Sequence, residues 1–242
     1  MNENMGLFNY SEAKKTLRVA LAIKQYLLQY TDMQESNIML CRQDDATNVS
    51  LTERSDIANT WDTDFYYSIH SDAGGTNNTT LFMYGGWRVN GVVYEKTPNG
   101  GKAFGEYLCP NLTGVMRVST RGNIADRCYY DGSSTHEYQE PYLSVNRRTN
   151  MALLLSEAGF HTIAEQQSRN LNDDYKKLEA VAAMQSILKY RGMELPDVDR
   201  RLHPEGISVE MSIFHNLYII YKGRCGQELA HRTIPRRRCQ WN

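Results

Sequence analysis

The chain has 242 residues, of which 41% are hydrophobic, and this is enough to bury the core of one globular domain. It holds no apolar stretch near the roughly 20 residues of a membrane-spanning helix and no charged-then-apolar leader, so we expect neither a membrane span nor a secretion signal in it. The net charge is −1, but residues 222–242 carry six basic side chains and one acid. The rest of the chain is therefore mildly acidic. A nucleic-acid-binding protein would show a basic face, so we expect no nucleic-acid partner.

The first part of the chain alternates helical and strand-type patterns. Residues 12–30 place apolar side chains at helical spacing, which predicts a helix. Residues 37–41 and 64–70 are short apolar runs of strand type. Residues 51–60, between these two runs, have the pattern of a short helix.

The middle of the chain is less regular. Residues 80–84 predict a strand, and Asn90-Gly91 is a turn signal that predicts a hairpin. Residues 101–108 predict a helix. Residues 111–150 are rich in Gly, Ser, Thr, Asn and Arg, and their weak periodicity predicts loops with one or two short strands.

Regular patterns return near the end. The apolar run at residues 151–156 predicts a strand that is buried on both faces. Asp173 or Asp174 can cap a last helix that runs to about residue 191 and stops at Gly192. We therefore expect one domain over residues 1–192 and a tail of uncertain structure over residues 193–242. The order of the elements predicts an α/β domain, with a twisted, mostly parallel sheet that has helices on both faces.

Two residues of chemical interest end strand-type runs. His70 ends an apolar run and precedes polar and glycine residues, so its imidazole should stand at the carboxyl rim of the sheet, where ligands bind in open α/β folds. A histidine at a strand end is, taken alone, more often a hydrogen-bonded structural residue. Glu157 follows the run at residues 151–156, and burying its carboxylate is costly unless it is paired or bound to metal. A salt bridge to Arg147 or Arg148 is the simpler alternative.

A third acid, Glu12, opens the first predicted helix. Its simplest role is electrostatic, because a carboxylate in the first turn complements the helix dipole.

Several short motifs follow one another over residues 10–191. They are Glu12 with Leu17 five residues later, Leu40-Cys41-Arg42, Leu51-Thr52-Glu53-Arg54 with Ala58-Asn59, Ser68-Ile69-His70, Arg121-Gly122, and Glu157-Ala158-Gly159-Phe160. Their order and spacing resemble the zinc-dependent N-acetylmuramoyl-L-alanine amidases (amidase type 3), which hydrolyse the bacterial cell wall. The resemblance makes residues 1–192 the catalytic domain, incomplete at its N-terminus.

The resemblance implies Zn²⁺ as the cofactor and peptidoglycan as the partner. Such enzymes hold zinc with two His and one Glu and leave one position open for water. By that correspondence Glu12 and His70 are metal ligands, and Glu157 is the general base. The bond cut is the amide between N-acetylmuramic acid and the L-alanine of the stem peptide. An envelope location, periplasmic or secreted, is implied for the full-length protein.

One part of the family pattern is not matched. The first zinc ligand of the family is a His that follows an opening strand and precedes the Glu-led helix. Only eleven residues precede Glu12 here, and none of them is His. We therefore expect a fragment that lacks this strand and this ligand, binds zinc weakly and is poorly active or inactive as it stands.

Two other histidines and three other functions are alternatives. His136 lies in a loop-rich stretch and is more simply a surface residue than a ligand. His161 follows the Glu157 motif and either contacts substrate or packs against the next loop. For the chain as a whole, the alternatives are a non-catalytic peptidoglycan-binding module and an inactive amidase fragment, and the retained Glu157 argues against a decayed site. A zinc carboxypeptidase would show His and Glu close together in one motif, which this sequence does not.

Overall fold

The computed structural model describes residues 7–75, 77–98, 100–130 and 137–195. His136 and most of the expected tail, from residue 196 onward, lie outside these ranges. In the described part, no helix is both long enough and apolar enough to cross a membrane.

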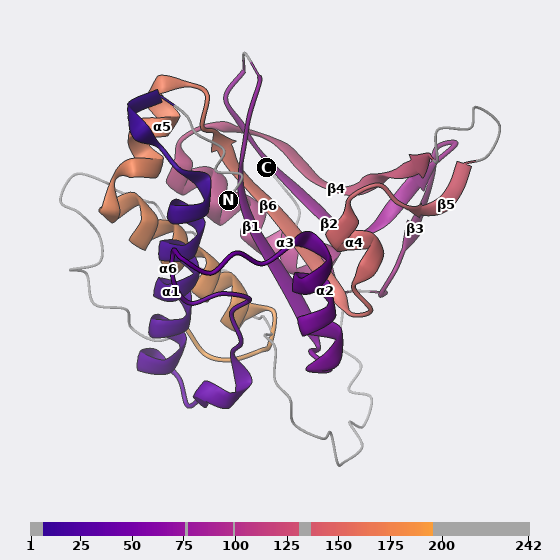
Figure 1. Cartoon of the computed structure of the whole chain (residues 1–242), viewed down its shortest axis with the longest axis horizontal. Coiled ribbons are helices and arrows are strands. Elements are labelled where there is room, and N and C mark those ends of the chain that lie inside the picture. The colour runs from indigo at the N-terminus through magenta and orange to yellow at the C-terminus, as the bar shows by residue number, and fades with distance from the viewer. Residues whose placement is uncertain (1–6, 76, 99, 131–136, 196–242) are drawn as a thin grey trace, which may run out of the picture.

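The centre of the fold is a six-stranded sheet in the order β1-β6-β2-β4-β5, with β3 paired to β2 (Figure 1). Two strand pairs are parallel, β1 with β6 and β2 with β4, and the other three pairs are antiparallel. The strands are β1 (Phe65–Asp72), β2 (Thr79–Val89), β3 (Val92–Glu95), β4 (Ser119–Tyr130), β5 (Glu137–Pro141) and β6 (Ala152–Phe160).

The sheet is therefore mixed, and the prediction of a mostly parallel sheet was wrong in this respect. A parallel crossover needs about a dozen residues or more, and only the short stretch 73–78 joins β1 to β2. The chain consequently turns back, so that β2 runs opposite to β1. β6 lies between these two strands, parallel to β1 and antiparallel to β2.

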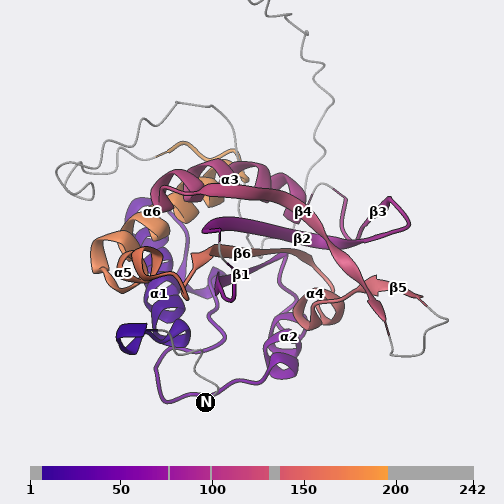
Figure 2. The ribbon, with the colours of Figure 1, turned by 90° about the horizontal axis from the view of Figure 1, so that it is seen from above.

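Helices cover both faces of the sheet, as predicted (Figure 2). One face carries α1, α3 and α6, and the other carries α2 and α4, so the α/β class is confirmed. The helices are α1 (Glu12–Tyr30), α2 (Leu51–Thr60), α3 (Gly101–Met116), α4 (Ser144–Arg148), α5 (Ala164–Leu171) and α6 (Asp173–Lys189), with 3-10 turns at Leu7–Asn9 and Glu35–Asn37.

Strand β6 separates two hydrophobic clusters. Ala152, Leu154 and Ala158 belong to the large cluster beneath α1, α3 and α6. Leu153 and Leu155 belong to a small cluster on the opposite face. This alternation confirms that the strand is buried on both faces.

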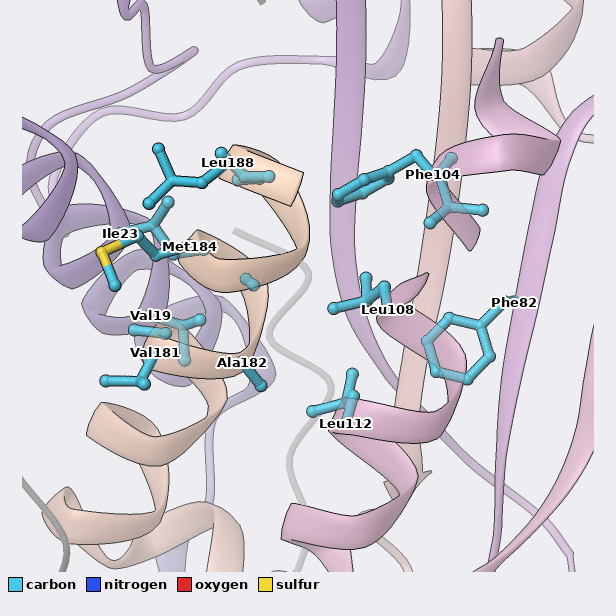
Figure 3. Close-up of a cluster of buried hydrophobic side chains, with 14 of the residues drawn as sticks. Val19, Ile23, Phe82, Phe104, Leu108, Leu112, Val181, Ala182, Met184 and Leu188 are labelled. Carbon is cyan, nitrogen blue, oxygen red and sulfur yellow. The ribbon is translucent and has the colours of Figure 1, made fainter. Parts of the chain in front are cut away.

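Helix α6 lies inside the protein between α1 and α3 (Figure 3). Every residue from Leu178 to Leu188 is buried, as expected of a helix that is enclosed by its neighbours on all sides. In Figure 3, Val181, Met184 and Leu188 lie toward Val19 and Ile23 of α1.

Most element predictions in the first half were confirmed, and the middle of the chain holds the errors. The helices at residues 12–30 and 51–60 and the Asn90-Gly91 hairpin are present. Residues 37–41, predicted as a strand, have no strand structure, and Asn37 ends a 3-10 turn. The stretch 111–150 contains the twelve-residue strand β4, because pairing with β2 outweighs a polar sequence of low strand propensity.

A buried ion pair joins α1 to α6. The Lys15 ammonium lies 2.6 Å from a carboxylate oxygen of Glu179, and the two side chains are 1% and 0% exposed. Removing one partner of such a pair leaves a charge without solvent or counter-ion, whereas replacing both partners with apolar side chains costs little.

Lys15→Met should therefore lower the free energy of unfolding by about 3–5 kcal/mol. The double variant Lys15→Met, Glu179→Met should recover most of this lost stability. Urea denaturation of both variants measures the difference. Lys24→Met is the matched control on the same helix, since its partner Glu35 is 77% exposed. Equal losses in the single and double variants would show that the charge pair is not the cause.

Candidate active site

The carboxyl-terminal ends of β1 and β6 bring two of the predicted site residues side by side. His70 on β1 is the register partner of Glu157 on β6. Alternate residues of a strand share a face, so His70 lies on the same face as Tyr66, and Glu157 on the same face as Leu155. Tyr66 and Leu155 belong to the small cluster beneath α4. The two polar side chains therefore share the face that α2 and α4 cover.

Glu12 reaches this pair from the first turn of α1. Ser11 caps the helix by accepting a hydrogen bond from the Lys14 amide, which fixes where the helix begins. The Glu12 Oε1 atom lies 3.1 Å from His70 Nδ1 and accepts a hydrogen bond from the Ser71 amide at 3.0 Å. The predicted ligands Glu12 and His70 are thus in contact.

Both ring nitrogens of His70 have partners. Nε2 lies 3.0 Å from the Ser68 hydroxyl, and Nδ1 faces Glu12. Burial lowers the pKa of the imidazole, but the Glu12 hydrogen bond and the charge of Glu157 outweigh it, and the pKa of His70 is raised. The ring is oriented from both sides before any ligand arrives.

Glu157 is the least satisfied carboxyl group of the site. Its Oε2 atom is buried, and no described residue hydrogen-bonds to it. Burial, reinforced by the charges of Asp72 and Glu12 and opposed by His70, raises the pKa of this carboxyl to about 7. Among the described residues, Glu157 forms no salt bridge with Arg147 or Arg148, and Arg147 pairs with Glu140 instead. A carboxyl that titrates near neutral pH is suited to general acid–base chemistry.

A cavity of about 620 Å³ opens beside Glu12 and His70. Arg42 and Arg54 line this cavity. Arg42 donates hydrogen bonds to the main-chain carbonyls of Ala13 and Asp44. Arg54 donates one to the main-chain carbonyl of Val49. Both arginines therefore help to hold the wall of the cavity. The other lining residues are Ala13, Thr16, Thr47, Asn48, Val49, Ser50, Leu51 and Ile69.

The rim beside Glu157 carries another ion pair. Arg121, from the Arg-Gly motif, binds Asp72 at the end of β1, and its guanidinium lies 5.0 Å from the centre of the Phe160 ring. The pair joins β4 to the end of β1 on the Glu157 side of the site.

His161 is not at the surface. Its side chain is 3% exposed, its ring stacks on Tyr10, and its Nδ1 lies 2.9 Å from the Ser71 carbonyl oxygen. Tyr10 also lies 2.5 Å from the Ser71 hydroxyl. These contacts hold Ser71, whose amide binds Glu12, so a positioning role fits His161 better than substrate contact. Sequence reasoning missed Tyr10 and Ser71, although both adjoin predicted site motifs.

The described residues contain no group of three or more His, Cys, Asp or Glu side chains arranged to hold a metal ion. Glu12 and His70 supply two donors of the kinds that zinc takes, and their contact is close enough for one ion to bind both. The residues present thus fit part of a zinc site.

Comparison with known proteins gives a consistent result. The sequence profile of the N-acetylmuramoyl-L-alanine amidase family matches residues 3–189. An N-acetylmuramoyl-L-alanine amidase of Bacillus licheniformis, CwlM, is 28% identical over 211 residues, which cover 87% of this chain. The chain spans 64% of the length of that relative.

Solved structures also resemble the fold. An N-acetylmuramoyl-L-alanine amidase from Clostridium difficile is 26% identical with a TM-score of 0.57, and the match covers 76% of this chain and 85% of the other. The catalytic domain of CwlV from Bacillus (Paenibacillus) polymyxa is 20% identical with a TM-score of 0.56, over 76% and 87% of the two chains, and supports the fold alone.

The raised pKa of Glu157 makes stability depend on pH. Between about pH 4.5 and pH 7 the folded chain keeps a proton that the unfolded chain has released, so the free energy of unfolding falls as pH rises through this window. Glu157→Gln removes the effect and should stabilise the metal-free protein at pH 8 by up to about 3 kcal/mol, with little change at pH 4.

Urea denaturation in the presence of a chelator, at both pH values, tests this. Glu165→Gln on α5 is the control, since the Glu165 side chain is 71% exposed. The prediction is contradicted if the free energy of unfolding that Glu157→Gln gains over the parent chain is no larger at pH 8 than at pH 4.

Proposed function

The chain belongs to the N-acetylmuramoyl-L-alanine amidase family, and we propose that it carries a zinc-dependent peptidoglycan hydrolase activity. The bond cleaved is the amide between N-acetylmuramic acid and the L-alanine of the stem peptide. The observation that carries the proposal is the convergence of Glu12, His70 and Glu157 at the ends of β1 and β6, beside an open cavity.

We assign Glu12 and His70 as zinc ligands. A carboxylate and an imidazole are both usual donors to catalytic zinc, and the two side chains already touch. The ion, when bound, lowers the pKa of its water and polarises the scissile carbonyl. Two protein donors bind zinc more weakly than the usual three, so we propose that a third comes from outside the described residues.

Glu157 is the proposed general base. Its carboxyl lies at the same sheet end as the ligands, and a pKa of about 7 lets it accept a proton from the attacking water and return it to the leaving amine near neutral pH. Its buried Oε2 atom has no hydrogen-bond partner among the described residues, so it is free to take up this proton.

Three further assignments belong to the same proposal. Residues 1–192 form the catalytic domain, peptidoglycan is the partner, and the protein acts at the cell envelope. Peptidoglycan lies outside the cytoplasmic membrane, so an enzyme that cleaves it must reach the periplasm or the exterior.

A non-catalytic peptidoglycan-binding module is the second candidate. The observation that favours it is that the described residues offer two adjoining metal donors where a catalytic zinc site usually has three. Glu157 argues the other way, because a buried carboxyl of raised pKa serves binding less readily than catalysis.

With zinc in excess, the chain should bind one ion and release stem peptides from purified peptidoglycan. His70→Ala should lose the bound zinc, since it removes one of two described donors. Glu157→Gln should keep the zinc while release slows by at least about 100-fold, because only the proton transfer is lost. Metal analysis and peptide release are measured on the same preparations.

Glu165→Gln again serves as the control and should match the parent chain in both measurements. If the chain binds peptidoglycan but takes up no zinc and releases no peptide, the binding-module function replaces the proposal.

A further inference from the structure

The cavity beside the candidate zinc ligands carries a positive charge that its own lining does not match. Arg42 and Arg54 both line this cavity of about 620 Å³, and Glu12 is the only acid among the described residues that line it. The Glu12 carboxylate is already engaged with the His70 ring and the Ser71 amide. The cavity therefore favours an anionic group on whatever molecule enters it.

Arg54 is held in place but is not neutralised. The side chain is partly buried, and its Nε donates to the Val49 carbonyl oxygen at 3.0 Å, which fixes the plane of the guanidinium group. In the part of the chain that the structure describes, no carboxylate pairs with Arg54, and neither of its terminal nitrogens has a hydrogen-bond partner. Two such nitrogens form a rigid fork that fits the two oxygens of a carboxylate.

The neighbouring charges are already committed. Arg42 donates to two main-chain carbonyls, and its guanidinium lies 3.9 Å from the Asp45 carboxylate. Glu53, which precedes Arg54 in α2, accepts a hydrogen bond from the Ser50 amide at 2.7 Å. Arg54 is thus the residue in the cavity wall that can bind an anion from outside the chain.

We propose that Arg54 binds a carboxylate of the stem peptide, namely the α-carboxylate of the residue that follows the L-alanine. The inference rests on the proposed hydrolase function, because the cavity that Arg54 lines also contains His70. In peptidoglycan this residue is D-glutamate, which is joined onward through its side-chain carboxyl group, so its α-carboxylate is either free or amidated. Two residues span at most about 7 Å, so a stem peptide whose scissile amide lies at His70 can place this group in the same cavity.

Arg54 is therefore a specificity residue that selects stem peptides with a free α-carboxylate over amidated ones. An amidated group carries no charge, and its NH₂ presents further donors to a guanidinium that can only donate. The guanidinium would then remain without a full set of acceptors in a partly buried position, which disfavours the amidated peptide.

Binding of three short peptides to the zinc-free chain tests this selectivity without measuring hydrolysis. Each peptide is N-acetyl-L-alanyl-D-glutamate, joined through the glutamate side chain to L-lysine. The first has a free glutamate α-carboxylate and an amidated lysine, the second has both groups amidated, and the third has only the lysine carboxylate free. Calorimetry at neutral pH with a chelator present should show the first peptide binding at least about 10-fold more tightly than the second, and the third binding like the second.

Arg54→Gln should reduce the affinity for the first peptide to that for the second and leave the second unchanged. Arg88→Gln is the matched control, since Arg88 is an exposed arginine on β2, and it should keep the preference of the parent chain. Damage to the cavity would weaken all three peptides alike, so the ratio of affinities separates charge recognition from a structural effect. The preference of the parent chain, and its decrease with added salt, can be measured without any variant.

The inference is overturned if the parent chain binds the first and second peptides equally, or binds neither. If the third peptide binds as tightly as the first, the carboxylate recognised is the one at the end of the peptide, and the assignment to D-glutamate is wrong. Failure of the proposed hydrolase function is a separate result, because it is measured by the release of stem peptides from peptidoglycan by the zinc-loaded chain.

Discussion

The geometry of the candidate site depends on how the first turn of α1 is held against the end of β1. The Glu12 carboxylate accepts a hydrogen bond from the Ser71 amide while it contacts the His70 ring. One turn further along the helix, the ion pair between Lys15 and Glu179 fixes the same segment to α6. The apolar face of α1 packs in the main core, and these two buried polar contacts add directional restraints at the start of the helix.

The polar contacts also limit how the site can change. Both nitrogens of His70 are engaged, so a metal ion must replace one of its hydrogen bonds, and the ring cannot turn away without losing the other. Tyr10 contacts the Ser71 hydroxyl, and His161 contacts the Ser71 carbonyl oxygen, so both hold Ser71 in place. The site is thus supported by residues that do not contact the cavity, as is usual where ligand orientation matters.

Much of this architecture follows from local sequence, and the rest does not. The helix from Glu12 to Tyr30 and the Asn90-Gly91 hairpin could be predicted because periodicity and turn chemistry are local. The strand β4 could not, because its polar sequence becomes a strand only by pairing with β2. The contact between Glu12 and His70 joins residues 58 positions apart, so it was reached only through the family resemblance. Residues 37–41 have strand-type composition without a pairing partner in the described ranges, and composition alone does not make a strand.

The buried carboxyl of Glu157 has an evolutionary consequence. Above neutral pH it weakens the fold, so replacement by an uncharged residue would be favoured in any lineage that no longer needed its chemistry. The same burial that suits this carboxyl to proton transfer thus makes the fold less stable above neutral pH than it would be with an uncharged side chain at this position.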